Sequence, residues 1–303
     1  MTEGHTPNSG KILVTGATGS VGGALITNLT AVGADVRALV RDESKAQGLR
    51  DAGVEVVVGD LDKPETLEGA FSGADKVFLL TAPNPNQVTQ ARNGFAAAKR
   101  AGNPHIVRLS AGAVRDKPGA LPRISGQHAE TDAELKAFSL PYTILSPHFF
   151  MQNTMMAAQT VASDGVVYMP FKDGRIGMID IRDIAEVAVK VLTEDDHEGK
   201  TYVLTGPASI SFHDVAAALT KALGKEVKYV DVPPEAARES MVSMGLPEWM
   251  ADALIEYSKA FSEDYGDFTA PDFERLTGHP ARSYETFARD FAQAFGSAVL
   301  QTT

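Results

Sequence analysis

Six short runs of apolar, mostly β-branched residues recur in the first half of the chain, and segments with helical spacing separate them. The runs are "KILVTG" (11–16), "DVRALV" (35–40), "VEVVVG" (54–59), "KVFLLT" (76–81), "HIVRLS" (105–110) and "YTILSP" (142–147). Such alternation is typical of a parallel sheet with helices on both faces. The intervening loops are short, so residues 11–150 are expected to form one doubly wound α/β domain.

After Phe150 the pattern changes, and helical segments dominate. "MQNTMMAAQTVAS" predicts a helix, and strands are expected around "GVVYMP" and "GMIDI", which pair with each other or return to the main sheet. Ser211 is predicted to cap a later helix that ends at Gly224. Residues 151–303 should therefore form a smaller, mostly helical C-terminal lobe, and residues 1–10 a disordered N-terminus.

Charge and composition exclude several classes of protein. The 39 acidic and 28 basic side chains give a net charge of -11, which disfavours nucleic-acid binding. With no cysteine, the chain has no disulfide, thiolate metal site or cysteine nucleophile. No apolar run approaches the roughly 18 residues of a membrane helix. A cytoplasmic protein without a membrane partner is expected.

Three glycines, Gly16, Gly19 and Gly22, follow the first predicted strand and open the first predicted helix. In this context the first permits a tight turn, the second lets the backbone approach a pyrophosphate, and the third allows close helix packing. Backbone amides at the helix start favour phosphate binding. The loop predicts a Rossmann dinucleotide site, with Thr18, Ser20 and Val21 as further contacts; the alternative is a glycine turn without a ligand.

The second predicted strand ends at Val40, where the adenosine ribose of a dinucleotide would lie. Arg41 follows, and Lys45 comes one helical turn later. An arginine here accommodates a 2′-phosphate, whereas an acidic residue would favour the ribose hydroxyls of NAD. Asp42 either caps the next helix or reaches the ribose, and Arg41 is alternatively a solvated surface charge. We expect NADP, with NAD as the alternative.

Further cofactor contacts are expected at the ends of the next two strands. Asp60 and Leu61 follow the third strand at the adenine end of such a site. Asp60 either accepts a hydrogen bond from adenine or caps the helix near Pro64. At the end of the fourth strand, the expected contacts are Thr81, Ala82 and Pro83.

The order of motifs resembles that of a known family. The motifs are "LVTGATGSVG", "LVRD", "GDL", "LSA", "LPYTILSPHFFMQN", "IDIRDIA" and "LTGHPARSYETFARDF". Together they are similar to the NmrA-like proteins, an atypical branch of the short-chain dehydrogenases/reductases. The resemblance implies a Rossmann domain with a substrate lobe. It implies either an NAD(P)H-dependent reductase of quinones, azo compounds or triphenylmethane dyes, or a regulator that binds the dinucleotide without turnover.

The usual catalytic tyrosine of short-chain dehydrogenases is missing from "LPRISGQHAETDAELKAF", the helix that should carry it. By resemblance, His128 takes the place of a catalytic lysine in isoflavone-reductase-like proteins, and Ile124 stands four residues earlier. His128 is expected to hold the cofactor ribose or to donate a proton. The alternative is an exposed helix residue paired with Asp132.

Two other segments end at the edge of the sheet where such folds bind ligands. Ser110 ends the fifth strand and is a candidate catalytic and cofactor-binding residue, or else a turn hydroxyl. The resemblance places Pro147, His148 and Phe149 beside the nicotinamide. The alternative is that Phe149 and Phe150 both belong to the core of the lobe. We expect one of the two phenylalanine rings to line the pocket and the other to be buried. The scattered histidines predict no metal site.

Two functions follow. The first is hydride transfer from NADPH to a conjugated acceptor such as a quinone or azo compound, which needs positioning more than a strong protein acid. The second is a dinucleotide-sensing regulator with a protein partner. Nucleotide-sugar or lyase chemistry on the same fold is a third alternative. By analogy with the fold, a homo-oligomer is also expected.

Overall fold

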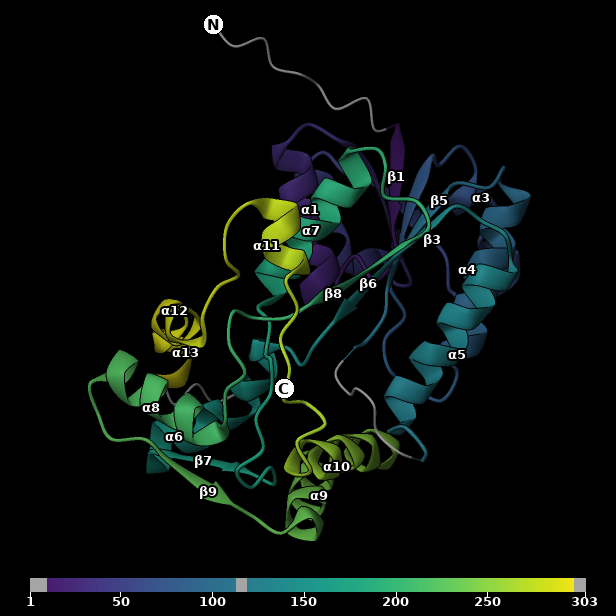
Figure 1. The fold of residues 1–303 in the computed structure, drawn as a ribbon. Coiled ribbons are helices and arrows are strands. Elements are labelled where there is room, and N and C mark those ends of the chain that lie inside the picture. Colours follow the sequence, from purple (N-terminus) through teal and green to yellow (C-terminus); the bar gives the residue numbers. More distant parts are fainter. Residues whose placement is uncertain (1–9, 113–118, 297–303) are drawn as a thin grey trace, which may run out of the picture. The chain divides into compact units, whose positions relative to one another are not determined.

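A seven-stranded sheet organises the computed structural model, which describes residues 10–112 and 119–296 (Figure 1). The strand order is β3-β2-β1-β4-β5-β6-β8, and the pairs from β3 to β6 are parallel. The strands are β1 (Lys11–Val14), β2 (Asp35–Val40), β3 (Glu55–Val58), β4 (Lys76–Leu79), β5 (His105–Leu109), β6 (Tyr142–Pro147) and β8 (Lys200–Leu204). The predicted doubly wound Rossmann fold is confirmed.

Helices fill most of the intervals between strands. Those up to β8 are α1 (Ser20–Ala31), η1 (Glu43–Lys45), α2 (Gln47–Asp51), η2 (Pro64–Thr66), α3 (Glu68–Phe71), α4 (Gln87–Arg100), α5 (Arg123–Ala137), η3 (Met151–Ala157), α6 (Ala158–Asp164) and α7 (Ile181–Thr193). Those after β8 are α8 (Phe212–Leu223), α9 (Pro234–Ser243), α10 (Glu248–Ser262), α11 (Asp272–Thr277), α12 (Tyr284–Asp290) and α13 (Ala292–Gly296). None of the described helices is long and apolar enough to cross a membrane.

The chain forms two compact units, and neither is continuous in sequence. The first unit comprises residues 1–111, 127–146 and 181–202, and the second comprises 112–126, 147–180 and 203–303. The sequence predicts one division near residue 150. The chain returns to the first unit because α7 packs against α1, while β8 extends the sheet beside β6. Residues 1–9 of the predicted disordered N-terminus lie outside the described residues.

Helices cover both faces of the sheet in the first unit. On one face α1 packs against α7, and on the other α3 and α4 cover the strands (Figure 1). Phe71 and Phe95 anchor the second of these layers and are fully buried. Strands covered on both faces require nearly continuous apolar runs, which is the pattern that the sequence shows.

The second unit packs its helices around a cluster of aromatic rings, in which Phe171 stacks on Phe212 with ring centroids 4.7 Å apart. Its helix α8 begins with a capping box at Ser211 and ends at Gly224 in the left-handed conformation, which confirms both predictions. The predicted pairing of "GVVYMP" with "GMIDI" is wrong. Strand β7 (Val166–Met169) pairs in parallel with β9 (Lys228–Asp231), whereas Ile179 makes an isolated bridge with Phe150.

Candidate functional site

The glycine loop joins β1 to α1 with a geometry that two of its glycines require. Gly16 has a φ of +64°, a conformation that side chains disfavour. A Cβ atom on Gly22 would lie 2.2 Å from the Gly16 carbonyl oxygen, so only glycine fits there. At Gly19 the corresponding distance is 3.3 Å. The tight turn and the close packing predicted for Gly16 and Gly22 are therefore present; the packing partner is the loop backbone.

Helix α1 starts without a side-chain cap. Gly19 occupies the N-cap position, and the first turn contains no acidic residue. Thr18, Gly19 and Ser20 are exposed, whereas Val21 is buried. The backbone amides at the exposed start of α1 have no side-chain cap, and the glycine loop beside them carries no side chain at Gly16, Gly19 or Gly22. This arrangement fits a pyrophosphate. These residues therefore suit the predicted dinucleotide.

Arg41 follows β2 and is exposed. Among the described residues it makes no hydrogen bond or ion pair. Oδ1 of Asp42 accepts hydrogen bonds from the Ser44 amide at 3.0 Å and the Ser44 hydroxyl at 2.7 Å, so this carboxylate caps η1. Lys45, at the end of η1, is also exposed. Arg41 and Lys45 thus offer two positive charges to a 2′-phosphate.

Asp60 and Leu61 form a turn directly after β3. Oδ1 of Asp60 accepts a hydrogen bond from the Asp62 amide at 3.0 Å, and the Asp60 amide bonds the Thr66 hydroxyl oxygen at 2.9 Å. The Asn93 side chain donates to the Leu61 carbonyl oxygen at 2.7 Å. Asp60 therefore stabilises its own turn. The alternative that it caps the helix near Pro64 is wrong, because Lys63 is the N-cap of η2 and that helix has no side-chain cap. Its contact with adenine stays a prediction.

The loop after β4 is tied to its neighbours by amide side chains that sequence reasoning missed. The Gln87 amide donates to the buried Thr81 hydroxyl at 2.9 Å, and the Asn84 amide donates to the Ala82 carbonyl oxygen at 2.8 Å. From α5, the Gln127 amide reaches the Asn84 carbonyl oxygen at 3.0 Å. These bonds fix the backbone leading through Pro83. The signal was the polar run "NPNQ" beside a strand end, where backbone groups need partners.

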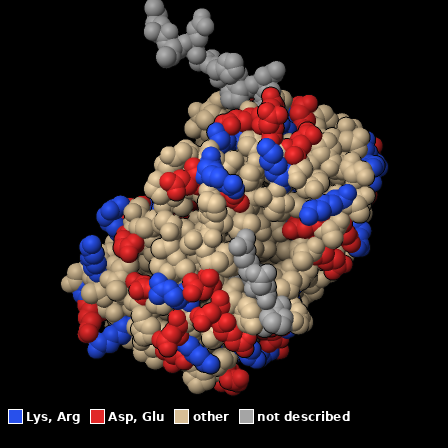
Figure 2. All heavy atoms as spheres, viewed as in Figure 1, with Lys and Arg blue, Asp and Glu red and all other residues tan. Residues whose placement is uncertain are grey.

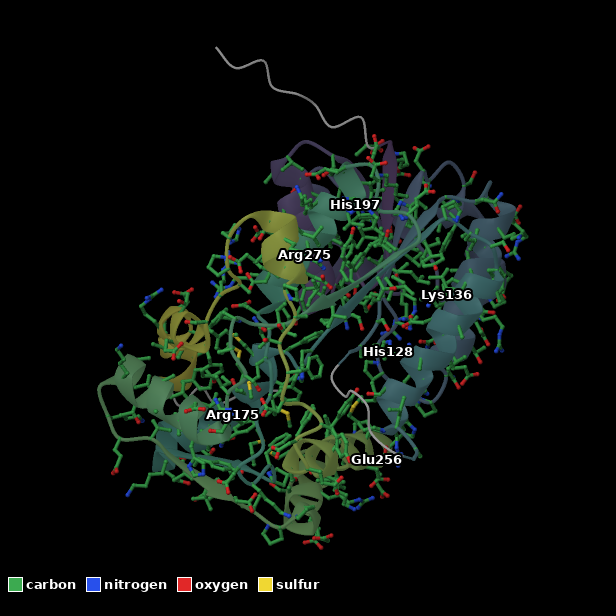
Figure 3. All side chains as sticks on the ribbon, in the orientation of Figure 1. His128, Lys136, Arg175, His197, Glu256 and Arg275 are labelled. Carbon is green, nitrogen blue, oxygen red and sulfur yellow. The ribbon has the colours of Figure 1, made fainter. Side chains whose placement is uncertain are left out.

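His128 lies on the side of α5 that faces the sheet (Figure 3). Its Nδ1 atom is 3.0 Å from Nη2 of Arg108, which comes from β5. Arg108 also pairs with Asp132, and the Ser110 hydroxyl donates to the same carboxylate at 2.7 Å. His128 is 6 % exposed. The alternative of an exposed histidine paired with Asp132 is therefore wrong, because Arg108 takes both partners.

Burial controls the protonation of this group. It lowers the pKa of His128 to about 3, and the adjacent Arg108 charge acts in the same direction. Burial also raises the pKa of Asp132, although Arg108 and the Ser110 hydroxyl favour the carboxylate. An ordinary histidine titrates near neutrality, whereas His128 does not. The imidazole is neutral, and it offers a hydrogen bond rather than an imidazolium acid.

Arg108 is the residue that sequence analysis overlooked. It is 1 % exposed within a strand whose five residues are all buried. The signal was available in "HIVRLS", because an arginine inside a buried strand requires a carboxylate and further acceptors nearby. The sequence does not show which acceptors meet it, since they lie on a helix about 20 residues later.

The segment Pro147–Phe149 belongs to the second unit. Nδ1 of His148 accepts a hydrogen bond from the Phe149 amide at 2.7 Å, and Nε2 lies 2.9 Å from the Gly266 carbonyl oxygen. The imidazole is thus committed to backbone groups. Phe149 and Phe150 are both half-buried, so the predicted division into one lining and one buried ring is wrong. Phe149 makes edge-to-face contacts with Phe171 and Phe261.

Two positions bear on the tyrosine that is missing from α5. Ile124 is buried in the apolar cluster of the second unit. The Tyr-x-x-x-Lys spacing of short-chain dehydrogenases occurs at Tyr168 and Lys172, but Tyr168 lies on strand β7 rather than on a helix, and Lys172 has a φ of +48°. The described residues contain no group of histidines and carboxylates that could hold a metal ion. On the face in Figure 2, acidic and basic side chains are interspersed.

Comparisons with known proteins agree with this geometry. NAD(P)H azoreductase from Xenophilus azovorans is 40% identical over 288 residues, covering 95% of this chain and 100% of that protein. Quinone oxidoreductase 2 from Escherichia coli is 31% identical, covering 89% and 94%. The structure of Citrobacter sp. triphenylmethane reductase complexed with NADP(H) has a TM-score of 0.83 and 30% identity, and it covers 93% of this chain and 99% of that one. The NmrA-like family model matches residues 8–284, and the chain belongs to that family.

Proposed function

We propose that this protein is an NAD(P)H-dependent reductase that prefers NADPH and reduces a flat, conjugated acceptor such as a quinone or an azo compound. The observation that carries the proposal is the glycine cradle at the uncapped start of α1, in a chain similar to an azoreductase over that relative's full length. The exposed Arg41, which has no partner among the described residues, supports the NADPH preference.

The first unit supplies the groups that would hold the cofactor. The backbone of Gly16, Gly19 and Gly22, with the amides of Ser20 and Val21, suits the pyrophosphate. Arg41 and Lys45 suit the 2′-phosphate, and the turn at Asp60 and Leu61 suits the adenine. All of these groups follow the carboxyl ends of β1, β2 and β3, the edge where open α/β sheets bind ligands.

The loop after β4 and the end of β5 would hold the reactive half of the cofactor. Thr81, Ala82 and Pro83 belong to a loop that side-chain amides fix in place. Beyond β5, His128 presents a neutral imidazole, and the Ser110 hydroxyl is fixed by Asp132. The expected place of Pro147, His148 and Phe149 beside the nicotinamide stays a prediction.

The chain's own chemistry is mainly positioning. Bound NADPH supplies the hydride. Neutral His128 is a weak acid that donates a hydrogen bond, so the proton that completes the reduction comes from water. A conjugated acceptor spreads negative charge over its own π system, which makes a strong protein acid unnecessary. The missing tyrosine is therefore compatible with turnover.

NADPH oxidation with a panel of quinones and azo dyes tests the proposal. We expect turnover with at least one acceptor, and at least about tenfold tighter binding of NADPH than of NADH, since one charge-assisted contact contributes about 1.5 to 3 kcal/mol. Tight NADPH binding without turnover on any acceptor would contradict the reductase and favour a dinucleotide-sensing regulator. Failure to bind either cofactor would contradict both functions.

A further inference from the structure

The Arg108 guanidinium reaches two partners at once from the middle of the sheet. Its Nη1 atom pairs with Oδ1 of Asp132, and its Nη2 atom lies 3.0 Å from Nδ1 of His128. The arginine side chain is 1 % exposed, so water does not compete for these contacts. Both partners lie on α5, one helical turn apart, so the planar fork of the guanidinium spans them.

Arginine fixes the direction of the bond to His128. A guanidinium carries only hydrogen-bond donors and stays protonated in proteins. Nδ1 of His128 must therefore accept, and the single proton of the neutral ring must lie on Nε2. Among the described residues, Nε2 makes no hydrogen bond, so this N–H is available for a ligand.

We infer that Arg108 is a positioning residue that holds His128 as a neutral imidazole with its proton on Nε2, and thereby makes it a permanent hydrogen-bond donor. Asp132 completes the arrangement. Its carboxylate accepts from both Arg108 and the Ser110 hydroxyl, which keeps the guanidinium in one orientation. A lysine at position 108 would keep the positive charge but would lack the planar fork.

The charges around the ring explain why it stays neutral. Among the described residues, Arg108 is the charged group in direct contact with His128; its Nη2 atom faces the ring nitrogen, and its Nη1 atom pairs with Asp132. Lys136, two turns further along α5, acts on Asp132 (Figure 3). Protonation of His128 would place a second positive charge against Arg108 in a buried site. The ring therefore has no titration in the range where enzymes of this kind are assayed.

The inference rests on the proposed function only for the identity of the ligand that receives the Nε2–H bond. An N–H donor suits the ribose hydroxyls of a dinucleotide or the oxygen of a quinone. Because the proton is held in place before a ligand arrives, binding requires no change of protonation. This predicts cofactor affinity and turnover that do not depend on titration of His128.

The test is histidine side-chain ¹⁵N NMR on the full-length protein without ligand. The chain has seven histidines, so His128 signals are assigned by their loss in His128→Gln. In the wild type we expect one tautomer, protonated on Nε2, from about pH 5.5 to 8.5. A proton on Nδ1, or titration inside that range, would overturn the inference, because Arg108 cannot donate to a protonated Nδ1.

Three variants then test the role of Arg108 itself. In Arg108→Met, His128 should gain a higher pKa and a mixture of tautomers; in Arg108→Lys, the pKa should stay low while an Nδ1–H fraction appears. Arg92→Met is the control. It removes an exposed arginine of α4 that pairs with Glu134, a residue on the same helix as His128, and it should leave the His128 signals unchanged. If both folded Arg108 variants kept the wild-type spectrum, Arg108 would not be the positioning residue.

These measurements are independent of the proposed function. The spectra are recorded without cofactor or acceptor, so a protein that reduces nothing still reports its tautomer. If Arg108→Met does not fold, the wild-type tautomer and Arg108→Lys still decide the question. NADPH fluorescence titrations of Arg108→Lys add a functional readout: at least about a threefold weaker affinity is expected, consistent with loss of part of one hydrogen bond. Unchanged affinity would show that the Nε2–H group does not contact the cofactor.

Discussion

Arg108 on β5 and Asp132 on α5 form an ion pair in which the arginine is almost completely removed from solvent. Two residues further along the same helix, Glu134 pairs with Arg92, whose side chain is 49% exposed. Helix α5 thus supplies the carboxylate of one buried and one exposed arginine pair, with the arginines on β5 and α4. The two pairs should differ sharply in their effect on stability, because an unpaired buried charge costs far more than an exposed one.

Asp132→Ala should lower the free energy of unfolding by about 3 to 5 kcal/mol, because it leaves Arg108 buried without its counter-charge. Glu134→Ala should lower it by at most about 1 kcal/mol. Urea denaturation at neutral pH measures both. Equal losses would mean that water enters the site and screens Arg108.

Gly22→Ala should destabilise the glycine loop, because the new Cβ would lie 2.2 Å from the Gly16 carbonyl oxygen. We expect a loss of about 1 to 3 kcal/mol in stability and more than about tenfold in NADPH affinity. Gly23→Ala is the matched control, since its Cβ would meet only the Ala17 carbonyl oxygen at 4.0 Å. That variant should bind NADPH normally and gain about 0.4 to 1 kcal/mol in stability.

Arg41→Ala should weaken NADPH by about tenfold or more and NADH far less, because it removes a charge-assisted contact of about 1.5 to 3 kcal/mol. Titration of both cofactors by fluorescence measures the ratio. Arg50→Ala is the control, since Arg50 is bound to nearby Glu43. Equal losses for the two cofactors would direct attention to Lys45. Arg37 is not a substitute, because it bonds Glu55 and the Ser72 carbonyl oxygen.

His128→Gln separates a hydrogen-bond donor from a titrating acid. A glutamine oxygen can accept from Arg108 while its amide donates outward, so NADPH affinity and turnover should stay within about threefold of wild type. His128→Ala lacks the donor and should bind NADPH about tenfold more weakly. Steady-state kinetics from about pH 5.5 to 8.5 complete the comparison. A large loss of turnover in His128→Gln, with normal affinity, would instead identify His128 as the proton donor.

Two buried histidines should make stability fall on mild acidification. The pKa of His105 is lowered to about 4 and that of His128 to about 3, from an ordinary value of 6.5. Burial is the main cause of both shifts. The unfolded chain therefore binds protons first as the pH falls. The stability from both neutral rings is fully present above about pH 6.5 and is lost progressively toward pH 4, by at most about 1.4 kcal/mol per pH unit for each ring.

Urea denaturation between pH 7 and about 5 measures this slope, to which His197 also contributes because burial lowers its pKa. His105→Gln should remove only the part that His105 contributes. A wild-type slope that persists in full in His105→Gln would show that His105 titrates alike in the folded and unfolded chain.

The sequence by itself determined the sheet and its glycine loop. Both depend on local rules: strands buried on both faces are apolar throughout, and Gly16 adopts a φ that other residues disfavour. The Ser211 cap and the Gly224 end of α8 were readable for the same reason, since caps involve neighbours within a few residues.

Only the tertiary structure decided the return of α7 and β8 to the first unit, the partner of β7, and the state of His128. Strand pairing depends on contacts between distant segments, so the residues of "GMIDI" do not show that Ile179 bridges Phe150 rather than joining β7. The environment of His128 depends on Arg108, which lies 20 residues earlier on a different element. Burial and a neighbouring charge set the protonation of a side chain, and neither is a property of the residues beside it in sequence.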